Sequence, residues 1–199
     1  SSDGTLTPLP ARHVDTGMGF ERICRALNGK QSNYATDLFV PIIEAIESLT
    51  EHRYGASAGL EDRFDSQNMD DRGDVACRVI ADHARALSCA IADGVMPSNE
   101  GRGYVLRRVL RRAARYGRQY LDIDGPFLTK LVEPVVELMG EMFPELRQRQ
   151  EYITETIRDE EEPSHRTREG AGGLYQGQAH RTDQPADDIV VADLDPTLR

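Results

Sequence analysis

The chain has 199 residues, of which 39% are hydrophobic, enough to bury a core. Its longest apolar runs, such as residues 38–43, fall far short of the roughly 20 residues that cross a bilayer, so no membrane span is predicted. The net charge of -10 argues at first against a nucleic-acid partner.

Three cysteines lie far apart, and no Cys or His spacing typical of a metal site accompanies them. Neither a disulfide framework nor a zinc site is therefore predicted, and a reducing, cytoplasmic setting fits this cysteine usage best.

The first third of the chain is predicted to hold one strand and two helices. Residues 12–16 alternate as a strand does, and residues 20–27 read as a short helix that ends at Asn28-Gly29. Residues 37–49 carry apolar side chains at helical spacing. The segment 55–73 is rich in Gly, Asp and Ser, which is typical of a loop.

The rest of the chain is predicted to be helical up to Pro163. Apolar spacing predicts helices over residues 74–93, from a cap at Ser98 or Asn99 to about Tyr120, over 126–139 and over 145–162. Pro134 should kink the third of these. From Pro163 onward glycines and prolines remove the helical pattern, and residues 188–195 form either a lone strand or a disordered stretch.

The stretch "VDTGMGFERI", residues 14–23, leads from the predicted strand into the first helix. Gly17 and Gly19 permit close approach of a ligand to the backbone, and a helix start offers free N–H groups to an anion. Arg22 is placed to bind a phosphate through two N–H groups, while Asp15 would suit a substrate ammonium. From these residues alone, a plain turn explains the pattern as well as a phosphate site does.

Basic charge is concentrated between Ser98 and Arg118, where seven arginines face a single acid, Glu100. On a helix, residues 105, 106, 109, 110, 113 and 114 would form the apolar stripe, with arginines on both flanks. Such a helix would present guanidinium groups to a phosphate backbone. The alternative is a solvated face whose arginines pair with acids elsewhere in the chain.

Asn99 lies in the loop before this helix, and two roles are open to it. An asparagine amide has both a donor and an acceptor, so it suits the reading of a base edge. It is also a common residue at the N-cap of a helix.

The stretch "ADHAR", residues 81–85, places Asp82, His83 and Arg85 in the middle of a predicted helix. Their types would suit catalysis, but the spacing favours a structural ion pair between Asp82 and Arg85, with His83 packed in the protein.

Together these stretches resemble one family. "VDTGMGFERI" is similar to motif 3 of the class II aminoacyl-tRNA synthetases in its alanyl form. "SNYATDLF", "ADHARA", "IADGVMPSNEGRGYVLRRVLRRAARYG" and "EEE" then follow in the order they take in alanyl-tRNA synthetases, from Asp3 to about Glu162.

The resemblance implies a nucleotide site at the front of the chain. Arg22 would contact the triphosphate of ATP, which the full enzyme uses with Mg²⁺, and Asp15 would hold the amino group of alanine. Gly17 and Gly19 would shape the adenylate pocket. Zinc is not expected in this segment, since the family's zinc ligands would lie after Arg199.

The resemblance also implies that the helical middle binds the acceptor stem of tRNA(Ala). Asn99 would read a G·U wobble pair from the minor groove, which is wide and shallow in A-form RNA. The aspartate Asp193 matches a second base reader of the family, although the expected following glycine is Leu194 here. Backbone contacts would come from Arg102, Arg107, Arg108, Arg111 and Arg112.

The predicted fold is therefore mainly α. Residues 1–33 would end a class II α/β catalytic domain with a strand and a helix, 34–162 would form a helical tRNA-recognition domain, and 163–199 a divergent or poorly ordered tail. Class II motifs 1 and 2 would lie before Ser1, so the 199-residue chain is expected not to aminoacylate by itself. The sequence indicates no oligomeric state.

Two other hypotheses remain. The chain could be a stand-alone RNA-binding module that kept the helical domain and lost catalysis. Alternatively, it is an acidic helical scaffold for protein partners, which leaves the order of the motifs unexplained.

Overall fold

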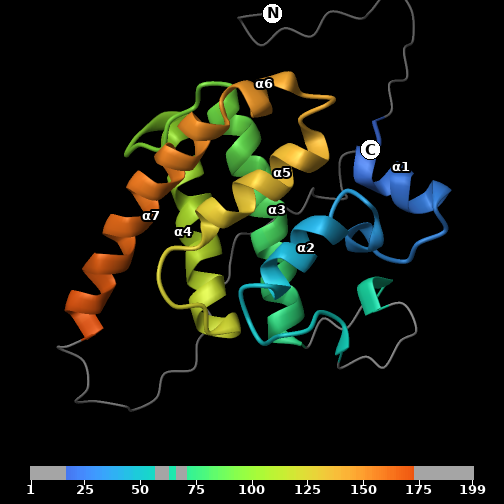
Figure 1. Ribbon diagram of the computed structural model, residues 1–199, viewed down its shortest axis with the longest axis horizontal. Helices are drawn as coiled ribbons and strands as arrows, with labels where there is room; N and C mark the ends of the chain where they lie inside the picture. The colour runs from blue at the N-terminus through green and yellow to red at the C-terminus, as the bar shows by residue number, and fades with distance from the viewer. Residues whose placement is uncertain (1–16, 57–62, 66–70, 173–199) are drawn as a thin grey trace, which may run out of the picture.

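The computed structural model describes residues 17–56, 63–65 and 71–172, and the backbone alone for 164–172. These residues form helices and connecting turns, without a strand, so the prediction of a mainly α fold is confirmed for this part of the chain (Figure 1). The strands predicted at 12–16 and 188–195 lie outside the described residues. The helices are α1 (Phe20–Leu27), α2 (Val40–Glu47), α3 (Arg72–Ala92), α4 (Gly101–Leu121), α5 (Val132–Met139), α6 (Pro144–Gln148) and α7 (Gln150–Gly172), with 3₁₀ turns η1 (Asn33–Ala35), η3 (Arg63–Asp65) and η4 (Leu128–Leu131).

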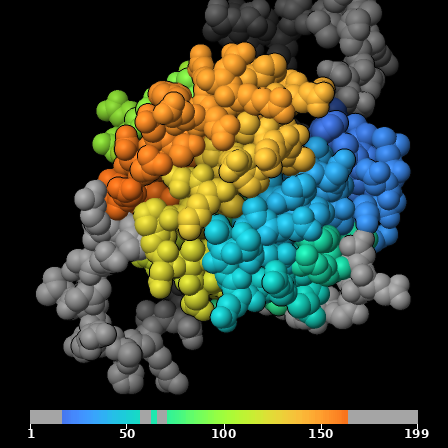
Figure 2. All heavy atoms as spheres, in the orientation of Figure 1, coloured from blue at the N-terminus to red at the C-terminus, as the bar shows by residue number. Residues whose placement is uncertain are grey.

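The two 21-residue helices α3 and α4 pack along each other and form the centre of the fold. The helices α2, α5 and α7 pack around this pair, and α1 lies at the edge of the bundle, on the side away from α7 (Figure 1). Figure 2 shows one face, which α2, α5 and α7 fill with α1 at its rim. One continuous hydrophobic core runs through α2 to α7.

Local sequence explains where α3 begins and which face it buries. Asp71 is the N-cap, and its Oδ1 accepts hydrogen bonds from the backbone N–H groups of Gly73 at 2.9 Å and Asp74 at 3.2 Å. The residues that follow repeat small and apolar side chains at intervals of three and four, so one face of the helix is apolar. Its fully buried members include Ala76, Cys77, Ile80, Leu87 and Ile91.

The buried stripe of α4 differs from the predicted one. Val105 was placed in the apolar stripe, but it is 60% exposed. The stripe follows a regular helical spacing and is made of three small residues and three leucines: Gly103, Leu106, Leu110, Ala113, Gly117 and Leu121. Two of these are glycines because a Cβ would collide with a neighbour, at Gly117 with the ring of Phe127 at 2.4 Å. Close approach, rather than side-chain hydrophobicity, selects those positions.

Three predictions about prolines and helix ends are wrong. Residues 126–139 form η4 followed by α5, and Pro134 is the third residue of α5. It causes no break there because the N–H groups of a first helical turn have no partner in the helix. Residues 145–162 divide at Arg149 into α6 and α7. Helix α7 continues through Pro163 to Gly172, although an interior proline removes its own N–H hydrogen bond and its ring crowds the carbonyl four residues earlier.

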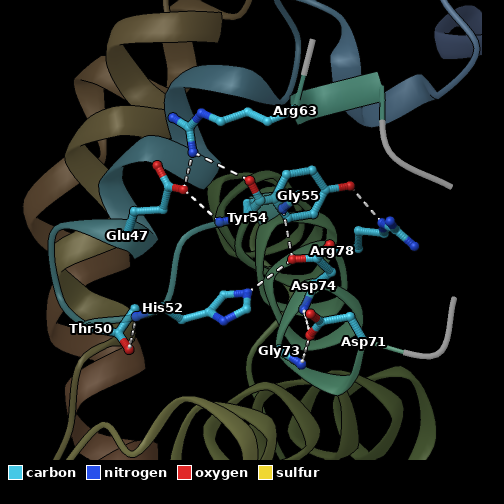
Figure 3. Close-up of polar contacts among 10 residues, drawn as sticks. All are labelled: Glu47, Thr50, His52, Tyr54, Gly55, Arg63, Asp71, Gly73, Asp74 and Arg78. Carbon is cyan, nitrogen blue, oxygen red and sulfur yellow. Dashed lines mark hydrogen bonds and ion pairs between the residues drawn. The ribbon is translucent and has the colours of Figure 1, made fainter. Parts of the chain in front are cut away.

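Buried acids bind the loop between α2 and α3 to the core (Figure 3). Glu47 accepts a hydrogen bond from the backbone N–H of Tyr54 at 2.8 Å and forms an ion pair with Arg63. Asp74, which is fully buried, accepts hydrogen bonds at 2.9 Å from the N–H of Gly55 and from Nε2 of His52. These contacts provide the loop with the hydrogen bonds that its buried backbone requires.

Glu161 on α7 is buried and binds the start of η4. Its two carboxylate oxygens accept hydrogen bonds from the N–H groups of Phe127 at 3.0 Å and Leu128 at 3.1 Å. Burial is the largest influence and raises the pKa of Glu161 to about 7, opposed by these two hydrogen bonds and by Arg118, and reinforced by Glu162.

We predict that Glu161 makes the protein less stable as the pH rises from about 4.5 to about 7. In this window the folded protein holds a proton that the unfolded chain has lost, so the free energy of unfolding falls with pH. At one pKa unit per about 1.4 kcal/mol, a rise from 4.5 to about 7 corresponds to a loss of about 2–4 kcal/mol, and the loss ends above about pH 7.5.

The measurement is urea unfolding from pH 4.5 to 8 of the wild type and of Glu161→Gln, which keeps an acceptor but cannot titrate. The difference in free energy of unfolding between the wild type and Glu161→Gln should fall by the predicted loss as the pH rises from about 4.5 to about 7. A constant difference would contradict the prediction.

Candidate functional site

A cleft of about 410 Å³ lies where α1 meets η1 and α3. Arg22 on α1 is exposed and lines this cleft, whereas the preceding residue, Glu21, extends to Arg85 on α3. The structure thus brings Arg22 to an open cavity, as a phosphate-binding arginine requires. Asp15 lies outside the described residues, so its predicted role in binding a substrate ammonium stays a prediction. The cleft is lined by Gly19, Glu21, Arg22, Asn33, Tyr34, Phe39 and Asp82.

The two glycines before α1 are not required by packing within the described residues. Gly19 is the N-cap of α1 with a negative φ, and a Cβ added at Gly17 would meet nothing within 4 Å. Both glycines are exposed, and Gly19 lines the cleft. This is the property that close approach of a ligand would use.

Both carboxylates of the cleft are ionised at neutral pH. The hydrogen bond from Arg85 is the largest cause of the lowered pKa of Glu21. A hydrogen bond with His83, at 3.3 Å, is the largest cause of the lowered pKa of Asp82. The predicted ion pair between Asp82 and Arg85 is therefore wrong, because each of these side chains has a nearer partner on another residue. Arg22 then provides positive charge for an anion in a cleft that also holds two acids.

A second candidate site is the arginine surface of α4, which we define as Arg102, Arg107, Arg108, Arg111 and Arg112. Arg102, Arg108, Arg111 and Arg112 are exposed and Arg107 is half-buried. The guanidinium carbons of Arg108 and Arg112 lie 5.8 Å and 5.4 Å from the ring centroids of Tyr104 and Tyr116. These tyrosines orient the charges without neutralising them.

Glu160 on α7 binds two members of the arginine surface. Its Oε1 lies 2.9 Å from Nε of Arg107 and 3.2 Å from Nη2 of Arg111. The alternative that the arginines pair with acids elsewhere is thus right for these two. Within the described residues, Arg102, Arg108 and Arg112 form no ion pair and present their charge to solvent.

Asn99 is exposed beside the first turn of α4, and its Oδ1 accepts a hydrogen bond from Nη1 of Arg107. The N-cap of α4 is Glu100, so the interpretation of Asn99 as the cap is wrong. Gly103 explains its place: a Cβ there would lie 2.2 Å from Oγ of Ser98 and 2.3 Å from the carbonyl of Met96. The loop before α4 therefore packs directly on the helix and holds Asn99 next to the arginine surface.

Sequence reasoning missed Glu160, Gly103 and the bond between Arg107 and Asn99. The sequence stretches "EEE" and "GRG" contain Glu160 and Gly103, but residue spacing within one helix does not predict which residues of α7 contact α4. The predicted second base reader, Asp193, lies outside the described residues.

Within the described residues, one group has the donor set for a metal ion: His52, Asp71 and Asp74, whose ligand atoms lie within 4.8 Å of one another. Asp71 caps α3, Oδ1 of Asp74 binds His52 and Gly55, and Oδ2 of Asp74 is buried without a hydrogen-bond partner among the described residues. These residues hold a loop on α3 and lie in neither candidate site. No helix in the part that the structure describes is long and apolar enough to cross a membrane.

The described part of the chain thus combines a helical core that carries an arginine surface with a short helix that brings an arginine to a cleft. The chain belongs to the class II tRNA synthetases: residues 1–188 match the family described as "tRNA synthetases class II (A)".

The similar curated proteins are alanine–tRNA ligases. The chain is 52% identical over 168 residues to that of Flavobacterium psychrophilum (84% of this chain, 18% of the relative). It is 55% identical over 160 residues to that of Chlorobium phaeovibrioides (80% and 17%). It is 48% identical over 177 residues to that of Geobacillus thermodenitrificans (89% and 18%). The chain thus spans less than a fifth of the length of these relatives, and its resemblance to alanyl-tRNA synthetases is confirmed.

We predict that Glu160→Gln increases the affinity of the chain for a short RNA duplex two- to fivefold at 0.1 M salt. The substitution frees Arg107 and Arg111 from a pair of the strength typical of exposed ion pairs, about 0.5–1 kcal/mol. The measurement is fluorescence anisotropy.

The matched control is Glu151→Gln, which removes the same charge from the exposed start of α7. An equal gain in RNA affinity in both variants would show that the effect comes from the change in net charge. No gain in Glu160→Gln would show that Glu160 does not compete with RNA.

Proposed function

We propose that this chain is the part of an alanine–tRNA ligase that supplies motif 3 of the adenylate site and recognises the acceptor stem of tRNA(Ala). The observation that carries the proposal is Asn99, held by Arg107 at the end of an arginine surface of which Arg102, Arg108 and Arg112 face solvent. The partners are alanine, ATP with Mg²⁺, and tRNA(Ala), and the setting is the cytoplasm.

At the front of the chain, Arg22 binds the triphosphate of ATP in the cleft beside α1. Its exposed guanidinium and the accessible backbone of Gly17 and Gly19 support this role. Asp15 precedes these glycines and accepts the ammonium group of alanine. Mg²⁺, when bound with ATP, neutralises phosphate charge that one arginine cannot balance.

At α4, phosphate contacts and base reading are divided between different side chains. Arg102, Arg108, Arg111 and Arg112 hold the RNA backbone, which fixes the register of the stem. Arg107 donates a hydrogen bond to Oδ1 of Asn99, whose second lone pair and amide NH₂ remain for a base edge. The wide, shallow minor groove of A-form RNA displays the base edges at which a G·U pair differs from a G·C pair.

The 199-residue chain alone should not transfer alanine to tRNA. Activation requires positioned charges on both sides of the α-phosphate, and within the described residues the cleft beside α1 offers only Arg22 as a positive side chain.

The assay is transfer of radiolabelled alanine to tRNA(Ala), with a full-length alanine–tRNA ligase as the positive control. Turnover by the purified 199-residue protein would refute this prediction.

A stand-alone RNA-binding module is the second candidate. The structure favours it in one respect, because α1 contributes no buried residue and the core of α2 to α7 is closed without it. The two candidates differ at Arg22, which has no role in a pure RNA binder. Binding of ATP that is lost in Arg22→Gln would favour the ligase.

We predict that Asn99→Ala reduces the discrimination between G·U and G·C acceptor-stem hairpins by about 1–3 kcal/mol, the size of a good base-edge contact. Stability should not change, since Asn99 is exposed and does not cap α4.

The measurement is the affinity for both hairpins at the same salt concentration. The comparison variant is Arg112→Gln, which should weaken both hairpins equally and reduce the salt dependence. An equal loss on both hairpins in Asn99→Ala would remove Asn99 as a base reader.

A further inference from the structure

We infer that Arg85 on α3 is a positioning residue: it sets the direction of Arg22 on α1 and so joins the nucleotide-binding end of the chain to the helical core that carries the arginine surface. This inference rests on the proposed role of Arg22. It assigns the orientation of an ATP contact to a residue of the RNA-binding part.

The guanidinium of Arg85 is held on its edge and on its face. Nη2 donates a hydrogen bond to Oε1 of Glu21 at 2.6 Å, and Cζ lies 4.4 Å from the ring centroid of Phe39. The Phe39 side chain belongs to the core at 3% exposure, so the arginine stacks on a fixed surface. With Arg85 only 16% exposed, water competes little for this contact.

Helix α1 has few other attachments. Its eight residues include none that is buried, and Phe20 and Leu27 are 63% and 82% exposed. A helix of this length is marginal by itself. Among the described residues, the bond between Glu21 and Arg85 is the only hydrogen bond or ion pair that joins a side chain of α1 to helices α2 to α7.

Because Glu21 and Arg22 are neighbours on one helix, the bond between Glu21 and Arg85 also fixes the direction in which Arg22 projects. Successive residues of an α-helix project about 100° apart, because one turn takes about 3.6 residues. With Glu21 fixed to α3, Arg22 is turned toward the cleft beside Asn33 and Asp82. Rotation of α1 about its axis would carry Arg22 away from that cleft.

Stability alone does not account for Arg85. Its Nε and Nη1 are buried and have no hydrogen-bond partner among the described residues, which costs free energy. A methionine could cover Phe39 without that cost. An arginine at this position therefore has a role beyond burial, and we assign that role to its hydrogen bond with Glu21.

The test is hydrogen–deuterium exchange of the 199-residue chain. Arg85→Met and Glu21→Gln should each raise exchange of the α1 amides at least tenfold and leave those of α3 and α4 unchanged. Arg85→Lys keeps the charge and should restore part of the protection. The control Arg158→Met removes an exposed arginine of α7 that forms no ion pair within the described residues and should change nothing.

Three results would overturn the inference: unchanged exchange in α1, an equal rise in α3 and α4, or wild-type α1 amides that exchange as fast as an unstructured chain. If Arg85→Met fails to fold, Glu21→Gln decides, since Glu21 lies outside the core.

The affinity for an acceptor-stem hairpin is measured on the same samples and should stay the same in Arg85→Met. A wild type that binds no RNA would contradict the proposed function. The exchange of the α1 amides would still test the role of Arg85, because that measurement involves no RNA.

Discussion

The packing of α4 against α3 is the constraint on which the other features depend. The buried stripe of α4 uses glycine, alanine and leucine, and its two glycines lie against the loop before α4 and the ring of Phe127, so this face of α4 is fixed against its neighbours. Because that stripe fixes one face, the arginines of α4 must point elsewhere. Two reach Glu160 on α7, and the others face solvent. The charge pattern follows from the packing of the helix.

Helix α3 contributes to both ends of the molecule. Its N-terminal turn, capped by Asp71, holds the loop after α2 through Asp74. Its middle reaches Glu21 through Arg85, and its length packs on α4. A single rigid helix thus places the cleft beside α1 and the arginine surface in a fixed relation. In a ligase this relation would matter, since the acceptor end of a tRNA must meet the adenylate.

The sequence was sufficient for features that local chemistry determines. The bounds of α1 were predicted correctly from an apolar pattern followed by Asn28-Gly29, and the order of the long helices followed from apolar spacing. Motif strings identified the family because their order and length are specific. Prolines were misread: Pro134 falls in the first turn of α5, where a proline is tolerated, and α7 continues through Pro163 although that residue lies in the helix interior.

Contacts between distant residues could not be predicted. Arg85 was expected to pair with Asp82 three residues earlier, but its partner is Glu21, 64 positions away. Glu160 meets Arg111 across 49 positions. Spacing within one helix predicts neighbours on that helix only, and the tertiary packing decides which acid each arginine meets.

The most direct test of this account is the affinity of the intact chain for two acceptor-stem hairpins that differ only in a G·U or G·C pair, measured over a range of salt concentrations. The account predicts that the logarithm of the binding constant falls linearly with the logarithm of the salt concentration. It also predicts that the hairpin with the G·U pair binds roughly tenfold more tightly, about the value of one base-edge contact. Binding that is absent, or insensitive to salt, would contradict the assignment of the arginine surface to RNA.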